Sequence, residues 1–87
     1  MTKGEYRVGI DFNPSASDTV NQIKRKAADL IDLIAHVQEA RVHTAGDFGV
    51  TDDQQTSEVI ELTDRAMREV ESAAMWAVKA ATKGSPH

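Results

Sequence analysis

Three consecutive basic residues, Lys24, Arg25 and Lys26, are the side chains best suited to chemistry in this sequence. A short segment upstream adds an aromatic ring, an amide, a proline and a hydroxyl: Phe12, Asn13, Pro14 and Ser15. If this segment folds back along a helix that carries the basic residues, a ring and an ammonium group come close together. A ring stacks on a nucleobase and an ammonium group binds a phosphate, so the combination suits a small nucleotide ligand.

Both features also have a simpler interpretation. The basic triplet can be a solvated helix face. Phe12 can be an apolar plug against the base of a helical hairpin. The residues alone leave these alternatives open.

Catalysis and metal binding have little support in the sequence. There is no cysteine, which excludes disulfides and thiolate metal sites, and there is neither a G-x-S-x-G motif nor a glycine-rich phosphate loop. We interpret the histidines as solvent-facing, since His36 and His43 share a face only if their helix continues past Arg41, and His87 ends the sequence. The carboxylates of the second half are interpreted as a solvated helix face: Glu58, Glu61, Glu69 and Glu71. We expect no catalytic residues, no metal and no cofactor.

The composition indicates one small domain with a thin core. The chain has 87 residues, a net charge of −4, 40% apolar residues and only 5% aromatic residues. The negative charge argues against general DNA or RNA binding, which needs a broad basic surface. The longest apolar run covers residues 73–78, far short of the roughly 20 that span a bilayer. We therefore expect a cytosolic protein that self-associates.

The elements that must position these residues are two long helices. Gly4, Gly9 and Pro14 predict a non-helical arm over residues 1–16. Val8 and Phe12 belong to a run with an apolar residue at every second position, which is typical of an extended segment with one buried face. A helix is predicted from about 18 to 41, with Ser17 as its N-cap. Its apolar stripe comprises Val20, Ile23, Ala27, Leu30, Ile31, Ile34 and Val37.

A loop over about 42–50 separates this helix from a second one. Thr51 and Gln54 have the capping-box spacing, and no glycine or proline follows until Gly84, so a helix is predicted over about 52–83. Its apolar stripe comprises Val59, Leu62, Ala66, Val70, Ala73, Ala77 and Ala80. The fold class is thus all-α: a short N-terminal arm and an antiparallel helical hairpin within a single domain, residues 1–87.

The end of the second helix predicts assembly. Between residues 72 and 81 nearly every side chain is apolar on all faces, with Met75 and Trp76 as the large ones. A helix that is apolar all round is buried all round, and one partner helix cannot cover it. Other copies of the chain are expected to do so, as a helical homo-oligomer.

Three sequence blocks together resemble a known family. They are the Phe12–Ser15 opening, the segment from Ile23 to Asp32, and the segment Glu71–Thr82 with its Ala-Ala-Met-Trp-Ala core. Over residues from about 7 to 83 the chain resembles the small phage proteins whose hairpin domain is shared by anti-CBASS and anti-Thoeris cyclic-nucleotide sponges.

The resemblance implies a function as well as a fold. Such proteins form compact oligomers, typically hexamers, in the cytoplasm of the infected bacterium. They bind cyclic dinucleotides, and some bind cyclic trinucleotides at separate sites. They do not cleave the ligand, and by holding it they keep the CBASS immune effector inactive. The alternatives are a sponge for a cyclic ADP-ribose type of signal and, outside this class, a structural or protein-interaction module.

The resemblance also suggests site residues. Lys24 matches the family's phosphate-binding lysine, and Lys26 is included with it. Phe12 is the candidate stacking ring, with Tyr6 as a competitor, and the backbone from Asn13 to Ser15 is expected to contact the ligand edge. The trinucleotide site of the family uses an arginine on the second helix, for which Arg65 and Arg68 are both candidates.

Overall fold

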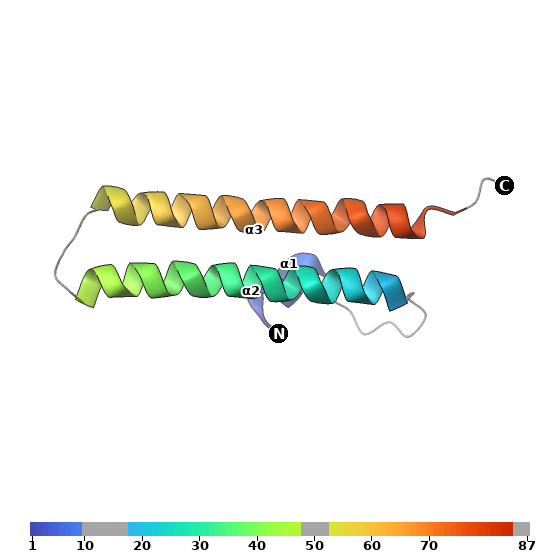
Figure 1. Cartoon of the computed structure of the whole chain (residues 1–87), viewed down its shortest axis with the longest axis horizontal. Helices are drawn as coiled ribbons and strands as arrows, with labels where there is room; N and C mark the ends of the chain where they lie inside the picture. Colours follow the sequence, from blue (N-terminus) through green and yellow to red (C-terminus); the bar gives the residue numbers. More distant parts are fainter. Residues whose placement is uncertain (10–17, 48–52, 85–87) are drawn as a thin grey trace.

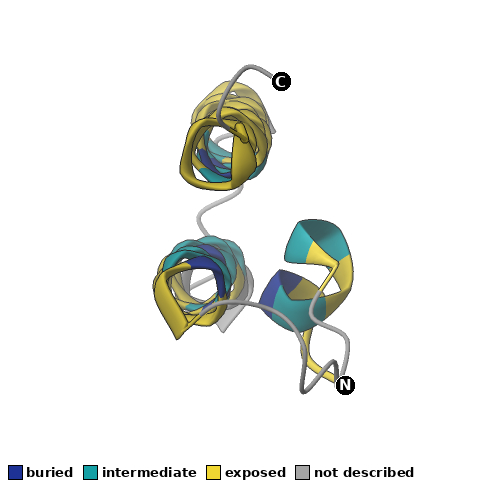
Figure 2. Cartoon of the chain, turned by 90° about the vertical axis from the view of Figure 1, so that its right-hand side faces the viewer, coloured by how far each residue is buried: buried dark blue, intermediate teal, exposed yellow. Residues whose placement is uncertain are grey.

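The computed structural model describes residues 1–9, 18–47 and 53–84, and the regular elements in these ranges are all helices (Figure 1). α1 spans Lys3–Val8, α2 spans Asp18–Asp47 and α3 spans Asp53–Thr82. α2 and α3 lie side by side and antiparallel, and α1 packs mainly against α2 (Figure 2). The predicted all-α helical hairpin is confirmed.

The prediction of a non-helical arm is wrong for residues 3–8, which form α1. Thr2 caps this helix: its hydroxyl accepts a hydrogen bond from the Glu5 backbone N–H at 3.1 Å, and the Glu5 carboxylate accepts one from the Thr2 N–H at 2.8 Å. Gly9 ends the helix in the left-handed conformation, with φ of 72°. This reciprocal capping outweighs the helix-breaking tendency of Gly4. Residues 10–16 of the predicted arm, including Phe12, lie outside the described residues.

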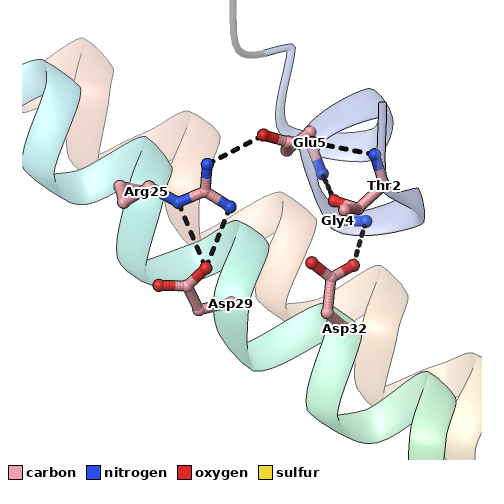
Figure 3. A network of polar contacts seen from close by, with 6 residues as sticks. All are labelled: Thr2, Gly4, Glu5, Arg25, Asp29 and Asp32. Carbon is pink, nitrogen blue, oxygen red and sulfur yellow. Dashed lines mark hydrogen bonds and ion pairs between the residues drawn. The ribbon is translucent and has the colours of Figure 1, made fainter.

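α1 is held on α2 by a close backbone approach at Gly4. This glycine is buried, and its N–H donates a hydrogen bond of 2.7 Å to the Asp32 carboxylate (Figure 3). A Cβ atom at this position would overlap the backbone of Ala28, which is itself fully buried. Only glycine therefore allows α1 to lie this close to α2.

Replacing Gly4 with alanine is expected to push α1 off α2. The overlapping atoms belong to the helix backbone, so no flexible side chain can relieve the clash, and overpacking of this kind costs about 1–3 kcal/mol. Faster amide hydrogen exchange in residues 3–8 would report the displacement. Gly84→Ala is the matched control, because an added Cβ there meets nothing within 4 Å. Equal exchange in the two variants would contradict this packing.

α2 is longer than predicted. The expected loop over about 42–50 is wrong for residues 42–47, which continue the helix to Asp47. Gly46 costs a helix about 1 kcal/mol relative to alanine, and near a helix end this is tolerated. The predicted N-caps, Ser17 and Thr51, lie outside the described residues.

The core is a narrow seam between the helices. Its buried residues are Val20, Ala28, Ile31, Met67 and Ala74. Gln38 ties α2 to α3 across this seam, since its amide donates hydrogen bonds to Thr63 at 2.8 Å and to Asp64 at 3.0 Å. The predicted α3 stripe is partly in the wrong phase: the buried line passes through Met67 and Ala74, while Leu62 is 66% exposed.

A second set of apolar side chains is exposed instead of packed in the seam. The surfaces of α2 and α3 that face away from each other consist mostly of exposed residues (Figure 2). On α2 these apolar side chains are Leu30, Leu33 and Val37, and on α3 they include Leu62 and Trp76. The radius of gyration is 16.6 Å, against about 12 Å for a compact chain of this length. Among the described residues, none of the helices combines the length and apolar character that a membrane span requires.

Candidate functional site

A groove of about 540 Å³ lies where α1, α2 and α3 meet. α1 contributes its C-terminal turn, α2 contributes one lysine, and α3 contributes most of the wall. The lining residues are Arg7, Val8, Lys24, Arg68, Glu71, Ser72, Ala74, Met75 and Val78. The volume is within the range of small-molecule sites, which run from about 300 to 1,000 Å³. Apolar side chains line much of the groove and charged side chains add the polar contacts that a ligand needs.

Among the described residues predicted for the first site, Lys24 is the one that lines this groove. It lies in the second turn of α2 and is half-buried. Its ammonium group donates a hydrogen bond of 3.3 Å to the Gly9 carbonyl, the residue that ends α1. This contact uses one of the three ammonium donors, so the others remain for a ligand oxygen.

The groove is locally positive on an acidic chain. Of the described residues that line it, three are cationic, Arg7, Lys24 and Arg68, and one is a carboxylate, Glu71. The whole chain carries a net charge of −4. An anion is therefore attracted only at short range, by the cations of the groove.

Arg25, next to Lys24 in the sequence, has a structural role instead. Its guanidinium contacts Glu5 at 2.8 Å and Asp29 at 2.9 Å and 3.1 Å, which links α1 to α2 (Figure 3). Hydrogen bonds from the Thr2 backbone and from Arg25 lower the pKa of Glu5 to about 2, so this carboxylate is ionised at neutral pH. The bonds to Glu5 and Asp29 raise the pKa of Arg25.

The other predicted residues of the first site fall into two groups. Phe12, Asn13, Pro14 and Ser15 lie outside the described residues. Lys26 is exposed and does not line the groove, and neither does Tyr6, which is 78% exposed on α1.

The two candidate arginines of α3 have different surroundings. Arg65 is exposed and pairs with Glu69 at 3.2 Å. Arg68 lines the groove and also a second concavity of about 350 Å³, together with Ser57, Ile60, Glu61 and Asp64. Of the two, Arg68 is the one that lies where a ligand could bind.

Sequence reasoning missed Arg7 as a groove residue and treated Glu71 as a solvated carboxylate. The two side chains form an ion pair of 3.3 Å between α1 and α3. The signal that could have located Arg7 is the Thr2–Glu5 capping box, which predicts a helical turn and brings Arg7 into its last turn.

The histidine interpretation changes in one respect. α2 does continue past Arg41, so His36 and His43 lie seven residues apart on the same helix. Within the part of the chain that the structure describes, no three metal-ligating side chains cluster together.

Comparison with known proteins points to one family. The model of the Acb2/Tad1 hairpin domain matches residues 5–82, nearly the whole chain. No curated protein and no solved structure gives a significant match. The match covers α1 from Glu5 onward, all of α2 and α3, and the described residues that line the groove. The chain belongs to the Acb2/Tad1 hairpin-domain family, the cyclic-nucleotide sponges of anti-CBASS and anti-Thoeris systems.

Proposed function

We propose that this chain binds and sequesters cyclic dinucleotides, and so keeps a bacterial CBASS effector inactive during phage infection. The observation that carries the proposal is the positive groove of an otherwise acidic chain, with Lys24, the residue that matches the family's lysine, on its wall. Lys24 binds a phosphate of the ligand. Phe12 stacks on a base, with Tyr6 as the alternative ring, and the backbone of residues 13–15 contacts the ligand edge.

Binding proceeds without turnover. The described residues that line the groove include no histidine and no cysteine, and no three metal-ligating side chains cluster among the residues that the structure describes. Cyclic trinucleotides bind at a second site that contains Arg68, for which the concavity between Ser57 and Asp64 is the candidate. The ligand is therefore held and released intact.

The binding unit is a homo-oligomer, which we propose to be a hexamer. The support is the apolar surface that one chain leaves uncovered, including Trp76 and Met75, which are 60% and 58% exposed. Large exposed apolar patches commonly mark protein interfaces. Two helices and one short helix cannot cover these side chains by themselves.

A thermal-shift panel tests the proposal. It contains cyclic dinucleotides of both linkage types, cyclic trinucleotides and cyclic ADP-ribose. A ligand at 100 times its Kd stabilises the folded state by about 2.7 kcal/mol, which raises the Tm of a small domain by on the order of 10 °C. The ligand is then released by heat and chromatographed, and we expect it intact. No shift with any compound would contradict the proposal and favour a protein-interaction module. Linear products that accumulate with time would show that the chain is an enzyme.

A further inference from the structure

We propose that Glu71 is an exchangeable counter-ion of the groove, and that a phosphate-bearing ligand displaces its carboxylate from Arg7. Arg7 then joins Lys24 as a ligand-contacting cation. The inference rests on the proposed function. It states which partner Arg7 has when the groove is empty, Glu71, and which it has when a ligand is bound, a phosphate.

The Arg7–Glu71 contact has the geometry of a weak, replaceable pair. A single guanidinium nitrogen contacts a single carboxylate oxygen at 3.3 Å, and the side chains are 26% and 44% exposed. Charge-assisted bonds of good geometry are shorter, about 2.7–2.9 Å, and an arginine commonly binds an oxyanion through two parallel bonds. A phosphate can therefore offer Arg7 a better partner than Glu71 does.

The other cations of the groove are also incompletely satisfied. Lys24 reaches the Gly9 carbonyl only at 3.3 Å, and Arg68 makes no hydrogen bond or ion pair with any described residue. Among the described residues that line the groove, Glu71 is the one carboxylate, and it stands against three cationic side chains.

Arg25 shows what a permanent structural pair looks like in the same chain. It makes three hydrogen bonds to two carboxylates, all between 2.8 and 3.1 Å, and it does not line the groove. Arg7 makes one longer bond to one carboxylate and does line it. This contrast separates a cation that fixes α1 on α2 from one that is available for exchange.

Glu71→Gln in the full chain tests the exchange, with calorimetric titration of a cyclic di-AMP probe and, in parallel, of inorganic pyrophosphate. Removing a partly exposed ion pair that competes with the ligand should tighten binding about two- to fivefold. Glu69→Gln is the matched control, because it removes the same charge from the same helix but lies outside the groove. We expect no change in its affinity, since exposed charges at a distance are screened.

A double-mutant cycle with Arg7→Gln identifies the mechanism. Arg7→Gln should weaken binding by about tenfold, and the gain from Glu71→Gln should shrink when Arg7 is absent. In the wild type, the Arg7 side-chain N–H resonance should shift on titration with either probe. An equal gain in both backgrounds, an effect no larger than that of Glu69→Gln, or weaker binding by Glu71→Gln would overturn the exchange.

The two probes separate the two proposals. If wild type binds cyclic di-AMP but the cycle shows no coupling, the exchange is wrong and the sponge function stands. If no cyclic nucleotide binds, the sponge function is wrong, and the same cycle with pyrophosphate alone decides whether Glu71 yields Arg7 to an oxyanion.

Discussion

Trp76→Ala is expected to dissociate the oligomer and to lower its free energy of unfolding by about 3–5 kcal/mol. The physical reason is the difference between its surroundings in one chain and in the assembly. In the single chain the residue is 60% exposed, with the Lys79 ammonium 5.5 Å from the ring centroid. Truncation at such a surface position usually changes stability by no more than about 0.5 kcal/mol. A much larger loss would mean that other copies cover the ring.

Sedimentation velocity and urea unfolding measure the two effects together. Trp76→Phe is the control, since it keeps an aromatic side chain at the same position and should retain most of the assembly. Wild-type protein that is monomeric and stable at micromolar concentration would contradict the oligomer. A Trp76→Ala variant as stable as wild type would instead exclude this ring from the interface.

Lys24→Ala is expected to weaken cyclic dinucleotide binding by about one to two decades. A hydrogen bond from an ammonium group to a phosphate contributes roughly 1.5–3 kcal/mol, and 1.4 kcal/mol corresponds to a factor of ten in Kd. Lys24 lines the groove, where its ammonium group donates a hydrogen bond of 3.3 Å to the Gly9 carbonyl. The loss should therefore appear in affinity, with the oligomer intact.

Lys26→Ala is the matched control for this change. It removes the same charge two residues further along α2, from an exposed side chain that does not line the groove. We expect the Kd of this variant for the cyclic dinucleotide to stay close to that of wild type, although the sequence analysis placed Lys26 in the site. Equal losses at the two positions would mean that the basic triplet acts as a diffuse field, and the groove would not be the ligand site.

Local signals determined most of the fold. The spacing of apolar residues and the lack of helix breakers predict two long helices, because both depend on neighbours within one or two turns. The helix start predicted at about residue 18 is also a local signal, and α2 begins at Asp18. α1 could also have been predicted, since Thr2 and Glu5 form a capping box within four residues.

The groove depends on contacts that no local pattern contains. Arg7 and Glu71 are 64 positions apart, and they meet only because Gly4 lets α1 lie directly on α2. Likewise, Lys24 and Arg25 are neighbours of similar character, yet one faces the groove and the other the Glu5 carboxylate.

The choice between apolar faces was also made by the tertiary structure. The long helices carry apolar residues on more than one face, and periodicity alone placed Leu62 in the predicted stripe while it left out the buried Met67. Burial against α2 separates them, with Gln38 fixing how the two helices face each other. Sequence therefore determined that these segments are amphipathic helices with an apolar surplus. Only packing decided which side chains close the hairpin and which remain outside, because that choice depends on a partner helix far away in the chain.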